Sequence, residues 1–110
     1  MAYYVYLIEC SNASYYTGYT TDIQRRYQEH CIGSKKCKYT RSFPPKKLLA
    51  YWEILSSQSD ALKLEKCIKQ LSKKQKTKLV AEETYLADVL QQHGHDASFI
   101  HHIQRAFDTV

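Results

Sequence analysis

Arginine, histidine, tyrosine and glutamate side chains give this sequence its clearest potential for chemistry. Arg26 and His30 are four positions apart, so on a helix they share one face. A guanidinium can grip a phosphate through its planar fork, and an imidazole that titrates near neutrality can move a proton. Two interpretations of this pair stay open: a phosphate-binding and proton-transferring pair, or two side chains that simply point into solvent.

Tyrosines and one glutamate extend this set. Ten of the 110 residues are tyrosine, most of them within the first 27 positions, and Tyr4 and Tyr6 share one face of a strand. A tyrosine hydroxyl that faces a cleft can orient a water molecule or accept its proton if the pKa of the phenol is lowered. Glu65 borders the apolar face of a predicted helix. It either forms an ordinary surface ion pair with Lys69 or anchors one Mg²⁺, which commonly needs only one or two protein carboxylates.

The first half of the chain predicts the elements that must position these side chains. Residues 3–9 and 15–19 are rich in β-branched and aromatic types and predict a hairpin. Gly18, inside the second strand, indicates a bulge or a close approach of the backbone. Thr21, with Gln24 three residues later, is a capping-box pattern that predicts a helix as far as about residue 31.

The following residues complete a small domain. Residues 33–47 predict a basic loop, and residues 48–55 are apolar enough for a buried strand that contains Trp52. A helix is predicted over about 59–71, and Ser72 with Gln75 predicts a short lysine-rich helix up to about residue 81. We therefore expect an α+β domain over residues 1–81, with a small three-stranded antiparallel sheet flanked by helices in the order β-β-α-β-α-α.

Residues 82–110 predict an acidic helical extension that packs on this domain. Two amphipathic segments, over about 85–90 and 99–107, are consistent with a helical hairpin. Two roles stay open for the extension. It caps the hydrophobic core, or its charge and apolar stripes provide a homodimer contact or shield the basic body.

The charge distribution favours a polyanionic partner. Residues 1–80 hold fifteen Lys and Arg against six Asp and Glu, a net charge of +9, and the remaining residues carry −4. A basic body of this kind is typical of nucleic-acid-binding proteins, although many soluble proteins have a lysine-rich surface. No apolar run reaches the roughly 18 residues of a membrane helix, and the start lacks the features of a signal peptide, so we expect a cytoplasmic protein without a membrane partner.

Two short motifs carry a resemblance to a known family. The residues YVY at 4–6, followed ten residues later by YTG at 16–18, resemble the hairpin of the GIY-YIG nuclease family. Arg26 and His30 fall at that family's offsets from the second tyrosine, and Glu65 matches its single acidic metal ligand. The basic loop and the later SKKQKTKLV are similar to the small stand-alone bacterial branch of the family.

The resemblance implies a divalent-metal-dependent endonuclease that hydrolyses phosphodiester bonds with Mg²⁺ or Mn²⁺. Arg26 would neutralise the non-bridging oxygens of the phosphate, with Glu65 as the metal ligand. Tyr6 is the first choice for activating the water and Tyr16 for orienting it, with His30 as a proton relay or support; the sequence does not separate the two tyrosines. DNA is expected in preference to RNA, with selectivity for structure rather than sequence and a role such as DNA repair.

Residues of the basic loop would contact the nucleic acid. The lysines and the arginine would contact phosphates and the tyrosine would stack on a base, so none of them would read sequence. These residues are Lys35, Lys36, Lys38, Tyr39, Arg41, Lys46 and Lys47. Many family members carry an asparagine after the glutamate helix, where this chain has only lysines. This departure motivates an alternative function, that of a non-catalytic nucleic-acid-binding module that retains the nuclease fold.

Overall fold

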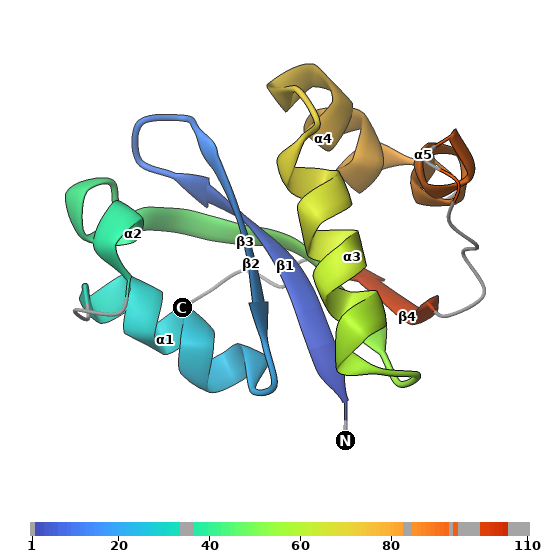
Figure 1. Cartoon of the computed structure of the whole chain (residues 1–110). Coiled ribbons are helices and arrows are strands. Elements are labelled where there is room, and N and C mark those ends of the chain that lie inside the picture. Colours follow the sequence, from blue (N-terminus) through green and yellow to red (C-terminus); the bar gives the residue numbers. More distant parts are fainter. Residues whose placement is uncertain (1, 34–36, 83–84, 93, 95–99, 106–110) are drawn as a thin grey trace.

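A single antiparallel sheet runs through the molecule and separates two groups of helices. The computed structural model describes residues 2–33, 37–82, 85–92, 94 and 100–105. The strand order is β2-β1-β3-β4, with β1 at Tyr3–Cys10, β2 at Tyr15–Thr20, β3 at Pro45–Ile54 and β4 at Ile100–Arg105. One face carries α1 (Ile23–Ile32) and α2 (Lys38–Ser42); the other carries α3 (Gln58–Lys69), α4 (Lys73–Ala81) and α5 (Tyr85–Gln92) (Figure 1).

Strand alternation distributes the apolar side chains of β1 between two cores. Val5 and Leu7 point toward α3 and join the larger core, which contains Trp52 as the sequence predicts. Tyr6 and Ile8 point the other way and pack with Tyr27 of α1 in the smaller core. Both cores are needed because each face of this sheet is covered by helices.

The β1–β2 hairpin is confirmed and brings Gly18 opposite Tyr6. A Cβ atom at Gly18 would lie 2.3 Å from both the Cζ and the hydroxyl oxygen of Tyr6. The β1–β2 pairing continues without a register shift through this position, so the glycine serves a close approach and not a bulge. Only a residue without a side chain lets the Tyr6 phenol lie across β2.

The helix ends follow local capping chemistry, with one correction. The N-cap of α1 is Asp22 and not Thr21, because the Asp22 carboxylate accepts a hydrogen bond from the Arg25 amide. Gly33 ends this helix in the left-handed conformation. The capping box of Ser72 and Gln75 is confirmed at the start of α4.

The predicted loop at 33–47 contains structure that the sequence did not predict. Residues Lys38–Ser42 form the short helix α2, and β3 begins at Pro45 instead of residue 48. A proline is tolerated as the first residue of a strand because it need not donate a ladder hydrogen bond there. The helix α2 makes tertiary contacts, among them a hydrogen bond between His30 of α1 and Thr40, and such contacts leave no periodic signal in the sequence.

The C-terminal region differs from the expected helical hairpin. Its first segment is helical, as α5, but residues Ile100–Arg105 form β4, a fourth strand of the sheet. The outer edge of β3 would otherwise present a row of unpaired N–H and C=O groups, and β4 pairs with that edge from Ala50 to Ile54. Among the helices that the structure describes, none has the length and apolarity required to cross a membrane.

Candidate active site

A buried chain of hydrogen bonds joins β1, α1 and α2. The hydroxyl of Tyr6 lies 2.8 Å from Nε2 of His30, and Nδ1 of His30 lies 2.7 Å from Oγ1 of Thr40. Thr40 donates its single hydroxyl proton to the carbonyl of Cys37 and must therefore accept from His30. It follows that His30 carries its proton on Nδ1, so Nε2 accepts a hydrogen bond from the Tyr6 hydroxyl.

Burial sets the protonation states in this chain. Tyr6 and His30 are each 1% exposed. Burial, with the nearby Arg26 charge, lowers the pKa of His30 to about 4, so the imidazole is neutral at physiological pH. Burial also raises the pKa of Tyr6 well above its usual range, and the hydrogen bond from Arg26 opposes that rise. Tyr6 is therefore a neutral phenol with an acceptor already in place for its proton.

Arg26 lies at the same phenol and completes the cluster. Its guanidinium hydrogen-bonds to Tyr6 and forms a 3.1 Å ion pair with Glu29, one turn along α1. The side chain is 21% exposed, so it reaches from the buried phenol toward solvent. Because a guanidinium has five N–H donors in a rigid fork, it can hold these two partners and still contact a phosphate.

Tyr16 connects this cluster to the molecular surface through a row of aromatic rings. Its ring lies 5.1 Å from that of His30 and stacks on Tyr39 of α2 at 5.8 Å. Tyr39 in turn packs against Phe43 at 5.3 Å, and its hydroxyl hydrogen-bonds to Ser14 in the hairpin turn. Tyr16 is half-buried, whereas Tyr39 and Phe43 are exposed, so the row leads from the cluster to solvent.

Glu65 lies outside this cluster, on the helix that covers the opposite face of the sheet. In α3 its side chain is 19% exposed, and its carboxylate lies 3.5 Å from Nζ of Lys69. Helix α3 packs against the hairpin, and β2 runs between α1 and α3 as the edge strand of the sheet (Figure 1). The structure therefore brings Tyr6, Tyr16, Arg26 and His30 together directly, and α3, which carries Glu65, lies on the other side of β2.

The donor set around Glu65 fits a hard, weakly held cation. Within the described residues, no group of three or more His, Cys, Asp or Glu side chains gathers as a transition-metal site would require. One partly exposed carboxylate is what Mg²⁺ or Mn²⁺ accepts when phosphate oxygens and water supply the remaining ligands. The ion pair with Lys69 would have to yield to such a cation.

The predicted nucleic-acid contacts are exposed where the structure describes them. Lys38 and Arg41 lie on α2, beside the stacked Tyr39, and Lys46 and Lys47 lie at the start of β3. Lys35 and Lys36 are outside the described residues. The described part of the predicted basic loop thus borders the aromatic row.

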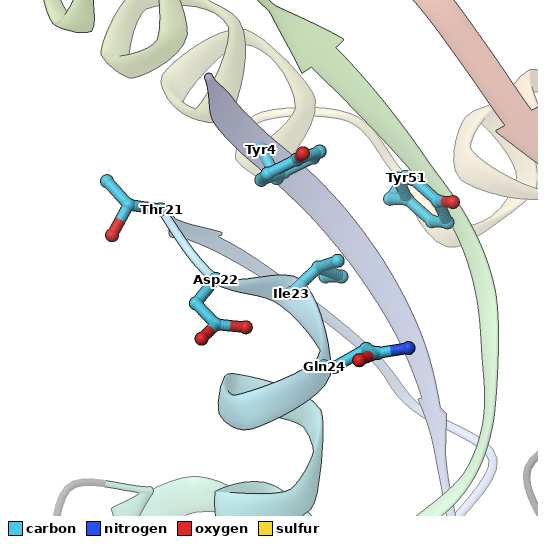
Figure 2. Close-up of a pocket in the computed structure, with 6 residues that line it drawn as sticks. All are labelled: Tyr4, Thr21, Asp22, Ile23, Gln24 and Tyr51. Carbon is cyan, nitrogen blue, oxygen red and sulfur yellow. The ribbon is translucent and has the colours of Figure 1, made fainter. Parts of the chain in front are cut away.

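A pocket of about 350 Å³ opens beside the cluster on the same face of the sheet. Figure 2 shows the rings of Tyr4 and Tyr51, from neighbouring strands, near the first turn of α1 with Asp22. The Tyr4 hydroxyl donates to Glu53 at 3.0 Å. No basic side chain is among the residues that line this pocket, so it does not suit the phosphate that Arg26 could hold.

Sequence reasoning missed Thr40, which fixes the tautomer and orientation of His30. Thr40 lies in a segment predicted as loop, ten residues after His30, and nothing in its spacing points to the imidazole. Glu29 was also missed, although its position three residues after Arg26 is the usual spacing of a helix ion pair. Gly18, by contrast, is predicted from the sequence to mark a bulge or a close approach, and the structure shows the close approach.

Comparison with known proteins gives concordant matches. The GIY-YIG catalytic domain matches residues 2–78. A UPF0213 protein of Halobacterium salinarum is 51% identical over 77 residues, which cover 70% of this chain and 97% of that protein. A UPF0213 protein of Halalkalibacterium halodurans is 44% identical over 81 residues, covering 74% of this chain and 84% of that one. The solution NMR structure of the UPF0213 protein from Bacillus halodurans has a TM-score of 0.45 at 43% identity, with the same coverage.

Proposed function

The chain belongs to the GIY-YIG family, and on that premise we propose that it is a divalent-metal-dependent endonuclease acting on DNA in preference to RNA. The observation that carries the proposal is that Arg26 and a neutral His30 both hydrogen-bond to the hydroxyl oxygen of the buried Tyr6. Such a buried, charge-bearing arrangement is typical of a catalytic centre, because a structural core gains little from it.

The reaction is the hydrolysis of a phosphodiester. The oxygen of a water molecule bonds to phosphorus, the bond from phosphorus to the 3′-oxygen breaks, the water loses a proton and the 3′-oxygen gains one. Negative charge grows on the non-bridging oxygens as this happens, and the guanidinium of Arg26 neutralises it. Glu29 and the Tyr6 phenol hold that guanidinium in position.

The roles of the two tyrosines are assigned by their exposure. Tyr16 is half-buried and can meet the attacking water, whereas Tyr6 is 1% exposed. We therefore give Tyr16 the contact with the water and Tyr6 the task of linking Arg26 to His30, the reverse of the first choice from sequence. His30 accepts a hydrogen bond from the Tyr6 hydroxyl through Nε2 and Thr40 holds the imidazole, so the two orient the phenol that contacts Arg26.

Glu65 would hold the metal ion from the other side of β2. When bound, Mg²⁺ or Mn²⁺ supplies positive charge that stabilises the leaving oxygen. A phosphodiester lying across the exposed edge of β2 could touch Arg26 on one side and reach Glu65 on the other. The position of β2 at the sheet edge supports this arrangement.

A single-stranded or flapped region is the substrate that best suits the exposed aromatic row. Tyr39 and Phe43 offer faces on which unpaired bases can stack, and every base has such a face. The neighbouring Lys38 and Arg41 would contact phosphates without reading sequence. This combination favours selectivity for structure over sequence.

A cleavage assay tests the proposal. Wild-type protein is incubated with labelled single-stranded, flapped and duplex DNA and with matched RNA, in Mg²⁺, Mn²⁺ or EDTA. We expect metal-dependent cleavage that is fastest on flapped or single-stranded DNA and falls at least about 100-fold in Arg26→Gln. Lys63→Gln, a change at an exposed position of α3, is the matched control and should cleave normally.

The alternative is a nucleic-acid-binding module without catalysis. The observation that favours it is the lysine-rich α4 in the region where the family carries an asparagine. Salt-dependent binding with no cleavage of any substrate in either metal would establish this alternative and reject the endonuclease.

A further inference from the structure

The pocket at the start of α1 holds two tyrosines that the proposed catalytic cluster does not use. Its volume is about 350 Å³, and its lining comes from three elements: Tyr4 of β1, Tyr51 of β3 and residues 21–24, which lead into α1. This volume is at the lower end of the range for small-molecule sites in proteins. The pocket can therefore accept a flat group the size of one aromatic ring system.

The two tyrosine rings form a preorganised aromatic wall. They lie edge to face, with centroids 6.0 Å apart and planes inclined by 69°. The hydroxyl of Tyr4 donates at 3.0 Å to Glu53, its direct partner on β3, and this hydrogen bond fixes the ring. Tyr51 packs against the smaller core. Both rings are half-buried, so part of each is open to a ligand that would lose little affinity to the ordering of side chains.

The charges of the pocket favour an uncharged ligand over a phosphate. Among the described residues that line it, none is lysine or arginine, and Asp22 is the one charged side chain. The Asp22 carboxylate accepts from the Arg25 amide at the positive end of the helix dipole, which makes the pocket only weakly anionic. The remaining polar groups are the Thr21 hydroxyl and the Gln24 amide, both neutral hydrogen-bonding groups.

The pocket adjoins the cluster of Tyr6, His30 and Arg26 on the same face of the sheet. Tyr51 is the direct β3 partner of Tyr6, and Tyr4 lies two residues before Tyr6, about 7 Å along β1. A stacked strand of nucleic acid advances about 3.4 Å per nucleotide. A base one or two nucleotides away from a phosphate at Arg26 is therefore within reach of the pocket.

We propose that this pocket binds one unpaired nucleobase of the substrate, close to the scissile phosphate. The base would pack against the rings of Tyr4 and Tyr51. Its edge would hydrogen-bond to the Gln24 amide, which extends from α1 toward the β3 side of the pocket (Figure 2). This amide supplies both a donor and an acceptor, so it can pair with any base. The inference rests on the proposed function for the identity of the ligand, a nucleic-acid strand.

The pocket lies at the opposite end of α1 from the exposed aromatic row. It adjoins the first turn of the helix, whereas α2, with Tyr39 and Phe43, is hydrogen-bonded to His30 near the last turn. Arg26 lies between the two ends. A strand that meets both would have bases held on either side of the phosphate at Arg26. A base inside a duplex cannot enter such a pocket without leaving the stack, so the pocket selects for unpaired nucleic acid.

The test locates the base by NMR, in EDTA so that no cleavage occurs. Isotope-labelled protein is titrated with a single-stranded DNA hexamer and, separately, with a hexamer that carries abasic sugars in place of nucleosides. We expect the backbone amides of residues 21–24 and the side-chain amide of Gln24 to shift with the first hexamer and to stay nearly still with the second. Shifts confined to α2, equal shifts with the abasic hexamer or no binding of either hexamer would overturn the proposal.

Two variants with matched controls measure the contribution of the pocket to binding. Tyr51→Leu removes one wall, and its control is Tyr85→Leu, a half-buried tyrosine of α5 on the opposite face of the sheet. We expect Tyr51→Leu to raise the Kd for the base-bearing hexamer at least about fivefold, the lower bound for the loss of one stacked ring, and to leave the Kd for the abasic hexamer unchanged.

Gln24→Ala tests the same pocket if Tyr51→Leu does not fold. Gln24 is an exposed residue of α1, and its control is Gln28→Ala, an exposed glutamine one turn further along the helix that does not line the pocket. Gln24→Ala should weaken binding of the base-bearing hexamer, and Gln28→Ala should not. Wild-type Kd values in both pocket variants would contradict the assignment.

These outcomes are separable from failure of the endonuclease proposal. Base-dependent shifts at residues 21–24 in a protein that never cleaves would keep the pocket and reject the enzyme. Cleavage without such shifts would keep the enzyme and reject the pocket.

Discussion

At the scale of single residues, the direction of three hydrogen bonds fixes how the buried cluster is protonated. Thr40 donates to a carbonyl and so accepts from His30, which leaves Nε2 of His30 to accept from Tyr6. A neutral imidazole in this tautomer accepts a hydrogen bond from the phenol and so fixes its orientation. Thr40 fixes the tautomer, and burial makes the imidazole expensive to protonate.

His30 should make the stability of the protein depend on pH. Its pKa is about 4 in the folded state and about 6.5 when unfolded, so the unfolded chain binds more protons between these values. The free energy of unfolding should therefore fall as pH decreases from about 6.5 to about 4, by up to about 3 kcal/mol from this group. Urea titrations across this range measure the effect.

His30→Gln is the control, since a glutamine does not titrate. The difference in unfolding free energy between wild type and variant should shrink as the pH is lowered toward 4. A difference that stays constant with pH would show that His30 is not held neutral.

Gly18→Ala tests the close approach between β2 and the Tyr6 phenol. The added Cβ would lie 2.3 Å from the Tyr6 ring, so either the strand or the phenol must shift. We expect destabilisation of about 1–3 kcal/mol, as for overpacking in other cores, with loss of cleavage. A thermal or chemical unfolding curve gives the cost.

The clash itself is isolated by repeating Gly18→Ala in a Tyr6→Ala background. The added methyl group should then cost much less, because the atoms that it meets are gone. An equal cost in both backgrounds would mean that backbone freedom, and not the phenol, requires the glycine.

Residue types and spacing predicted part of this cluster. The four-residue spacing of Arg26 and His30 indicated a shared helix face, and their contacts to Tyr6 lie on that face. Thr40 could not be found, because its role depends on a tertiary meeting of α1 and α2. The sequence also could not predict that Tyr16 is more exposed than Tyr6, since both are tyrosines on neighbouring strands.

At the scale of elements, capping chemistry and apolar periodicity predicted the helices that have local signals. The start of α4 at Ser72 and the helical positions of α3 followed from such patterns. The short α2 and the strand β4 did not, because α2 is held by His30 and β4 by the open edge of β3. Four scattered apolar residues were too few to distinguish a helix from a strand in the last segment.

Ser72→Ala should destabilise α4, because it removes the capping box at the start of this helix. The Ser72 hydroxyl accepts from the Gln75 amide at 3.1 Å, and the Gln75 side chain accepts from the Ser72 amide at 2.9 Å. Removing the hydroxyl should cost about 1 kcal/mol in the free energy of unfolding. Ser59→Ala, at an exposed position in the first turn of α3, is the control and should cost less, and equal costs would contradict the capping role.

At the scale of the whole molecule, the residues of the proposed site lie on helices that cover opposite faces of the sheet. Arg26 and His30 lie on α1, on the side of the smaller core, and Glu65 lies on α3, on the side of the larger one. The sequence could name these residues through a family resemblance. It could not show that α1 and α3 lie on either side of the edge strand β2, because that follows from the strand order and the packing of the helices.

The C-terminal region contributes to the hydrophobic core and to the sheet. Leu86, Val89 and Leu90 of α5 are buried in the larger core, and β4 covers the edge of β3. We propose that this region caps the core of the domain, so deletion of residues 82–110 should lower the unfolding temperature sharply or give insoluble protein. A truncated chain that stays folded and cleaves faster would instead make the region a shield of the active site.

The most direct test is the single-turnover rate of cleavage of a saturating flapped DNA in Mg²⁺ by wild type, Arg26→Gln, Glu65→Gln and the double variant. If the two faces act as one site, each single change should lower the rate at least about 100-fold, and the double variant should be little slower than the worse single one. Cleavage by Glu65→Gln at the wild-type rate would contradict a site that spans the edge of β2.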